Sequence, residues 1–117
     1  MNPPITRSEC NGRLTSIGDA LYVIGGKWKL RVIVALMEGT KRFNEIQRTV
    51  EGISARVLSS ELKDLELNGF VKRVVHASQT PVVVEYSITP YADTLGDVLE
   101  ALSSWGTNHR NKLRKER

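Results

Sequence analysis

The sequence predicts an α+β fold that is mostly α-helical. Apolar residues recur at helical spacing over most of the 117 residues. Two runs rich in β-branched residues, 70–76 and 82–88, are typical of strands. Hydrophobic residues make up 40% and charged residues 26% of the chain, as in ordinary globular proteins. A single domain with one core is therefore expected over residues 13–106.

The two ends are expected to lie outside this domain. Residues 1–12 contain two prolines and an Asn-Gly pair and show little periodicity, which predicts a flexible N-terminal arm. Residues 107–117 are expected to form a basic C-terminal tail. Acidic and basic side chains balance over residues 1–100, so residues 101–117 supply the whole net charge of +4. Bulk charge therefore does not locate a nucleic-acid-binding face.

Two helices are expected before residue 40. The first has an apolar stripe with steps of three and four residues, formed by Leu14, Ile17, Leu21 and Ile24. Gly25 and Gly26 interrupt this pattern, so the first helix is expected to end just before them. The second, KWKLRVIVALMEG, is apolar around most of its circumference and is expected in the middle of the core.

Residues 42–73 predict two helices joined by a tight turn and followed by a strand. A short helix over residues 43–50 leads to a turn at Gly52. Ser54 is a favourable N-cap for a longer helix, and Gly69 is the expected stop after it.

The longer helix has two chemically different faces. Leu58, Leu62 and Leu65 share the side suited to a core. The opposite side is polar and partly basic, and consists of Arg56, Ser59, Ser60 and Lys63. This pattern is typical of a helix-turn-helix, whose second helix enters the major groove of DNA. DNA binding is therefore the working hypothesis, with a merely solvated helix face as the alternative.

Candidate DNA contacts follow from this geometry. Because such a helix enters the groove N-terminus first, its first turn and polar face are expected to approach the bases: Ser54, Ala55, Arg56, Ser59, Ser60 and Lys63. Lys41, Arg42 and Arg48 are candidate phosphate contacts, with plain surface solvation as the alternative. Whether Arg56 pairs with a guanine edge or holds a phosphate stays open.

A hairpin and a final helix are expected after residue 69. The strands 70–76 and 82–88 flank ASQTP, which predicts a hairpin with a five-residue loop, in the position of a wing. Thr89 and Pro90 fit the N-cap and first turn of the last helix. Its apolar positions step four, three, four and three residues, at Tyr91, Leu95, Val98, Leu102 and Trp105.

The apolar stripes of the first and last helices have two interpretations. Each helix could pack on its own core. Two such helices flanking a compact helix-turn-helix instead favour a homodimer, which suits recognition of two half-sites. The expected dimer interface consists of Leu14, Ile17, Leu21, Ile24, Leu95, Val98, Leu102 and Trp105.

Three segments, in order, carry a family resemblance: GGKWKLRVIVALMEGTKRFNEI, GISARVLSSELKDLELNGFVKR and VEYSITPYADTL. They resemble the winged helix-turn-helix transcriptional regulators of the HxlR type. The resemblance implies a homodimer that binds operator DNA through the long helix and the wing, and dimerises through the first and last helices. A basic residue is common just before the VEY segment, where this chain has Val83. Wing contacts are then expected from Ser78, Gln79 and Thr80, or from Lys72 and Arg73.

Cys10 is the single cysteine, so an internal disulfide is excluded. Members of the family often have an oxidant-responsive cysteine at the start of the first helix, at a place that falls near Thr15 here. Cys10 is the candidate redox sensor, with an incidental cytosolic cysteine as the alternative. A small-molecule or oxidant effector is left open.

Other functional classes find little support in the sequence. His76 and His109 lie on different elements in no metal or triad spacing, so no enzyme, metal or cofactor is expected. The chain has no apolar run of membrane length and no signal-peptide segment, which predicts a cytoplasmic protein without a membrane partner. The expected function is a homodimeric repressor that binds palindromic double-stranded DNA. The alternative is a winged-helix protein-interaction module, which Leu67 on the polar face favours.

Overall fold

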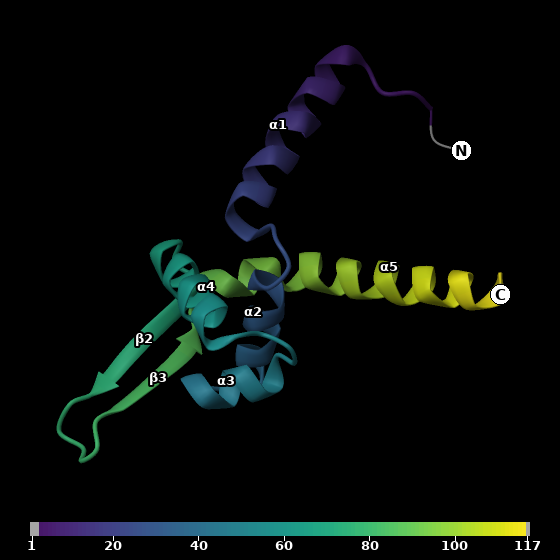
Figure 1. Cartoon of the computed structure of the whole chain (residues 1–117). Coiled ribbons are helices and arrows are strands. Elements are labelled where there is room, and N and C mark those ends of the chain that lie inside the picture. Colours follow the sequence, from purple (N-terminus) through teal and green to yellow (C-terminus); the bar gives the residue numbers. More distant parts are fainter. Residues whose placement is uncertain (1–2, 117) are drawn as a thin grey trace.

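The computed structural model describes residues 3–116 and has a small body from which two long helices and a hairpin project (Figure 1). The helices are α1 (Arg7–Ile24), α2 (Lys29–Met37), α3 (Phe43–Thr49), α4 (Ala55–Leu67), the 3₁₀ helix η1 (Pro90–Leu95) and α5 (Gly96–Lys115). The strands are β1 (Lys41–Arg42), β2 (Val71–His76) and β3 (Val83–Ile88). The predicted α+β, mostly helical, winged helix-turn-helix fold is confirmed.

The core lies where α2, α3, α4 and the base of the hairpin meet. Val32, Ile33 and Leu36 of α2 are almost completely buried, as predicted for a central helix. The leucines of the apolar face of α4 are buried against them. Val34 and Met37 of α2 are exposed, so this helix is less enclosed than its composition suggested.

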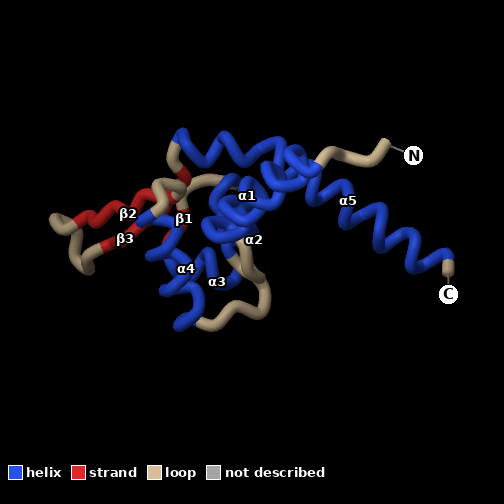
Figure 2. The backbone as a smooth tube through the Cα atoms, turned by 90° about the horizontal axis from the view of Figure 1, so that it is seen from above, coloured by secondary structure: helices blue, strands red, loops and turns tan. Residues whose placement is uncertain are grey.

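The sheet contains a strand that the sequence did not predict. β1 pairs antiparallel with β3, and the sheet order is β1-β3-β2. Lys41 lies opposite Tyr86, and Arg42 lies opposite Glu85. A strand of two residues is too short to show an alternating pattern, and it forms only because β3 offers a free edge. The hairpin and the C-terminal end of α5 lie at opposite ends of the molecule (Figure 2).

Local hydrogen bonds explain where the central helices begin and end. The hydroxyl of Ser54 accepts a hydrogen bond from the amide of Val57 at 3.1 Å, which confirms the predicted N-cap of α4. Gly69 has a φ of +83°, a conformation that favours glycine, and ends the helix as expected.

Thr89 is the N-cap residue of η1, as predicted from the sequence, but its side chain makes no capping hydrogen bond. Its hydroxyl instead donates to the carbonyl of Gly69 at 2.5 Å, and its amide donates to the carbonyl of Phe70 at 3.0 Å. Pro90 does occupy the first turn, but this turn is 3₁₀, and α-helical geometry starts only at Gly96. The start of the last helix is thus attached to the end of α4.

Both terminal helices are longer than predicted. α1 begins at Arg7, because the hydroxyl of Thr6 caps it by accepting from the amide of Glu9 at 3.1 Å. Residues 7–12 are therefore helical and not part of an arm. α5 continues to Lys115, and its last turn carries basic residues that suit the negative end of the helix dipole. Residues 1, 2 and 117 of the predicted arm and tail lie outside the described residues.

Candidate nucleic-acid interface

The outer face of α4 is the centre of the candidate interface. Arg56, Ser60 and Lys63 are exposed, as are Ser54 and Ala55 at the start of the helix. Ser59 is half-buried, because it lies on the flank of α4 that faces the hairpin. The predicted stripe is therefore accessible, but its members do not all have the same surroundings.

Leu67 continues this face and is 85% exposed. It is the last residue of α4, at the opposite end from Ser54 and Arg56. A single exposed leucine is common on protein surfaces, so it does not amount to an apolar docking patch.

The inner flank of α4 is attached to α2 by Lys29, a residue that no sequence pattern singled out. Lys29 Nζ lies 3.1 Å from Glu61 Oε2 and 3.4 Å from Asp64 Oδ2. Burial of the ammonium alone would lower the pKa of Lys29, but hydrogen bonds and charges from both carboxylates outweigh it and raise this pKa above 10.5. The signal was present as two acidic residues three positions apart beside the apolar face.

The three candidate phosphate contacts near α3 differ in their surroundings. Lys41 Nζ lies 3.3 Å from Glu38 Oε1, and its side chain is only 17% exposed. Arg42 is exposed, and its amide donates to Glu45 Oε1 at 3.0 Å, which fixes the start of α3. Arg48 is exposed in the last turn of α3. Arg42 and Arg48 are therefore free to meet an anion, whereas Lys41 is engaged by a carboxylate of its own chain.

The hairpin carries the other candidate contacts. Gln79 and Thr80 are exposed in the loop, where the amide of Gln79 donates to the carbonyl of His76 at 3.2 Å. His76 Nε2 lies 2.7 Å from Glu85 Oε1, which links the two strands. A side-chain contact therefore joins the two strands close to the loop.

The terminal helices expose most of the predicted dimer residues. Leu14, Ile17 and Leu21 of α1 are exposed, and so are the three predicted residues of α5, namely Val98, Leu102 and Trp105. Ile24 and Leu95 are only 9% and 8% exposed because they belong to the core of the subunit. The prediction that Ile24 and Leu95 belong to the dimer interface is therefore corrected, because their side chains are not available to a partner.

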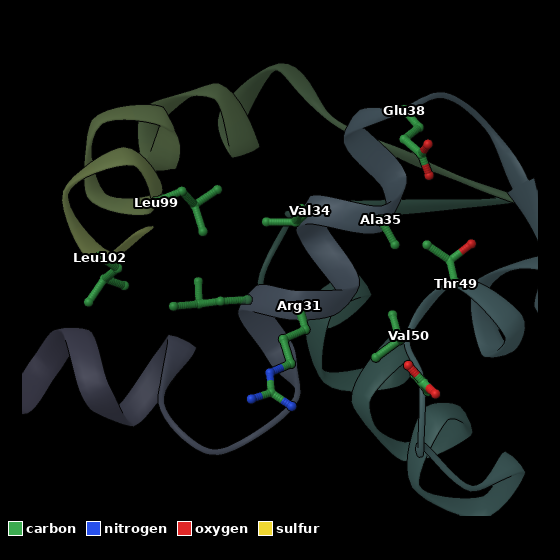
Figure 3. Close-up of a pocket in the computed structure, with 10 residues that line it drawn as sticks. Arg31, Val34, Ala35, Glu38, Thr49, Val50, Leu99 and Leu102 are labelled. Carbon is green, nitrogen blue, oxygen red and sulfur yellow. The ribbon is translucent and has the colours of Figure 1, made fainter. Parts of the chain in front are cut away.

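A groove of about 580 Å³ lies beside these helices, between α2, the α3–α4 turn and α5 (Figure 3). Val34 and Ala35 line it from α2, and Leu99 and Leu102 line it from α5. Charged groups at the groove are Arg31, Glu38 and Glu51. The exposed side of α2 is thus continuous with the apolar stripe of α5.

Cys10 lies in the first turns of α1 and is half-buried. It precedes Leu14 by one helical turn, so it extends the exposed stripe of α1 toward the N-terminus. Within residues 3–116 no three His, Cys, Asp or Glu side chains gather in a manner that could hold a metal ion. None of the helices in that part is long and apolar enough to cross a membrane.

Comparisons with known proteins identify helix-turn-helix transcriptional regulators over most of the chain. The HxlR-like helix-turn-helix model matches residues 23–114. An HTH-type transcriptional regulator of Halalkalibacterium halodurans is 45% identical over 98 residues, covering 83% of this chain and 86% of the relative.

Solved structures agree with these matches. A MarR-family transcriptional regulator from Enterococcus faecalis V583 is 37% identical with a TM-score of 0.72, and the match covers 98% of this chain and 99% of that one. The redox regulator HypR in its reduced form is 38% identical with a TM-score of 0.77, covering 86% of this chain and 98% of that one. These relatives are transcriptional regulators, not enzymes. The chain belongs to the HxlR-like helix-turn-helix family of transcriptional regulators.

Proposed function

We propose that the protein is a homodimeric repressor that occupies a palindromic operator in the cytoplasm. The observation that carries this proposal is the pairing of an exposed, partly basic recognition helix with exposed apolar faces on α1 and α5. The helix supplies the contact with DNA, and the terminal helices supply the contact between subunits. Two copies related by a twofold axis would present two recognition helices to half-sites about one helical turn apart.

The DNA-reading part of the proposal rests on the first turns of α4. Arg56 is exposed in the first turn, where a recognition helix meets the base edges. The hydroxyl of Ser54 is used as a cap, so its role is to hold this turn. Arg42 at the end of β1 and Arg48 in α3 supply phosphate contacts, and Gln79 and Thr80 supply them from the wing.

The dimer part of the proposal rests on surfaces that a single subunit leaves uncovered. Trp105 is 67% exposed, and its ring stacks on His109 with 4.9 Å between centroids. Exposed apolar side chains in two stripes and a continuous groove exceed what scattered surface residues explain. Burial of both stripes in a twofold interface accounts for them together.

Selection of bound fragments from a library of genomic DNA tests this function directly. We expect the recovered fragments to share an inverted repeat with half-sites about one helical turn apart. A reporter gene placed behind such a site should be expressed less when the protein is present. Recovery of no common sequence would favour the protein-interaction alternative, and a rise in expression would overturn repression alone.

We also propose that an oxidant effector acts at Cys10. The reduced structure of the HypR redox regulator is similar to this chain, which gives the proposal its precedent. Cys10 continues the exposed stripe of α1, so oxidation there would alter the proposed contact between subunits.

A further inference from the structure

A cleft of about 330 Å³ lies between α4 and the β2–β3 hairpin. Ser59, Lys63 and Glu66 line it from α4, and Arg73 and Tyr86 line it from the hairpin. Arg56 and Ser60 do not border this cleft, so the polar face of α4 divides into two parts. One part faces outward, and the other faces the wing.

The cleft brings together cations from elements that are separate in the sequence. Lys63 and Arg73 carry positive charges there, and among the described residues Glu66 is the only acidic one that lines it. Within residues 3–116 neither Lys63 nor Arg73 has an acidic partner within 4.0 Å, unlike Lys29 and Lys41. The cleft therefore has an excess of positive charge that the subunit itself does not neutralise.

The strand register explains why Arg73 lines the cleft and its neighbour does not. Arg73 pairs with Tyr86 across the hairpin, and paired residues project from the same face of a sheet. Lys72 pairs with Ser87 and projects from the other face, because successive side chains alternate. Of the two basic residues of β2 that the sequence offered as wing contacts, only Arg73 therefore borders the cleft, and Lys72 is not a contact there.

We infer that this cleft holds one backbone phosphate of DNA, clamped by Lys63 from the helix and by Arg73 from the wing. The inference rests on the proposed function, in which α4 lies in the major groove and the hairpin contacts phosphates beside it. A sugar-phosphate strand borders the major groove on each side, so the strand that the hairpin contacts passes between helix and hairpin. The hydroxyl of Ser59 is placed to donate to the same phosphate.

This phosphate clamp, formed by Lys63 and Arg73, gives the residues on the polar face of α4 two different roles. Lys63 and Ser59 set the position of α4 relative to the wing on the duplex, while Arg56 and Ser60 are left to face the bases. A phosphate gripped from both sides fixes the register of the helix in its groove. Loss of the clamp should therefore weaken binding to every sequence by a similar factor.

Salt-dependent titrations of the selected operator by fluorescence polarisation test the clamp, with Arg73→Ala compared against Lys72→Ala. Both variants lose one positive charge from β2, but only the first removes a side chain from the cleft. We expect Arg73→Ala to lower the slope of log affinity against log salt by about one. Between about 50 and about 200 mM salt, it should then lose roughly threefold less affinity than the wild type loses. Lys72→Ala should keep the wild-type slope.

Equal slopes for Arg73→Ala and Lys72→Ala, with unchanged thermal unfolding of both, would overturn the clamp. So would a changed order of preference among operator variants for Arg73→Ala, because that result would show base contact. Lys63→Ala combined with Arg73→Ala should lose less affinity than the two single losses predict, since both cations hold one phosphate. Independent losses would overturn the shared phosphate.

Failure of the clamp can be distinguished from failure of the proposed function. A wild-type protein that selects and binds no DNA overturns the proposed function and the clamp together. A wild-type protein that binds its operator while Arg73→Ala matches Lys72→Ala overturns the clamp alone.

Discussion

At the scale of single residues, the structure separates basic side chains that the sequence could not rank. Lys41 and Arg42 are neighbours with the same charge, yet Lys41 is held by Glu38 at 3.3 Å and Arg42 is exposed. No sequence pattern pointed to Lys29, which has two carboxylates within 3.4 Å of its ammonium group. Partners of this kind depend on side-chain placement, which spacing along one helix does not specify.

Arg56 is the residue whose replacement should most directly affect operator recognition. Arg56→Ala is expected to weaken specific binding by about 1 to 3 kcal/mol if the guanidinium pairs with a base, or to lower the salt slope by about one if it holds a phosphate. Polarisation titrations of the operator and of single-base variants distinguish these results. Arg110→Ala on α5 removes the same charge far from α4 and serves as the control. Wild-type affinity and slope for Arg56→Ala would remove this residue from the interface.

Cys10 provides a second test at this scale. Oxidant treatment should change the operator affinity of the wild-type protein and leave that of Cys10→Ser unchanged, because the chain has no other thiol. Affinity measured before and after treatment, and again after reduction, gives the result. The same response in both proteins would assign the oxidant effect to another group, and no response in either would end the sensor proposal.

At the scale of elements, the helix-turn-helix was predictable and the connections between elements were less so. Ser54, Gly52 and Gly69 mark the limits of α4 because capping and positive φ are local properties. β1 escaped prediction since its partner strand lies more than 40 residues away in the sequence. The start of α1 was missed because the Thr6 cap follows two prolines that suggested disorder.

The attachment of α4 to α2 gives a prediction about stability. Lys29→Met should lower the free energy of unfolding at neutral pH by roughly 1 to 3 kcal/mol, because Glu61 would remain mostly buried without its cation. Urea unfolding followed by circular dichroism measures this change. Lys112→Met breaks an exposed pair with Glu116 and should cost less than about 0.5 kcal/mol. Equal effects of the two substitutions would contradict a structural role for Lys29.

The pH dependence of the same variant has a defined sign. Since the folded pKa of Lys29 is raised above 10.5, its contribution is fully present below that pH and is lost as pH rises through the folded pKa. The difference in unfolding free energy between wild type and Lys29→Met should therefore be constant at neutral pH and shrink in strongly alkaline solution. A difference that grows with pH would show the opposite linkage.

At the scale of the whole molecule, the order of helices and strands predicted from the sequence agrees with the structure. The predicted set of exposed apolar residues agrees only in part. The heptad-like stripes of α1 and α5 were visible in the sequence, but Ile24 and Leu95 continue those stripes into the core. The spacing of apolar residues shows which of them share a helix face. It does not show which part of that face packs on the core and which part is exposed to solvent. That transition appears only once α1 and α5 are seen to extend beyond the other helices (Figure 1).

The proposed dimer is tested on α5. Leu102→Asp places a charge in the apolar stripe and should yield monomers by light scattering, with weaker binding to a two-half-site operator than the wild type. Ser104→Asp adds the same charge to an exposed position on the other side of the helix and should remain dimeric. A dimer that persists in Leu102→Asp would place the interface elsewhere.

The two hydrogen bonds of Thr89 have a mechanical consequence. They join the residues that follow α4, Gly69 and Phe70, to the residue from which η1 and α5 continue. The position of α4 relative to the start of η1 and α5 is therefore held in part by this threonine. In a dimer held through α5, a rotation of the paired helices by a few degrees would change the distance between the two copies of α4. An effector could then release an operator by altering that distance, without unfolding any element.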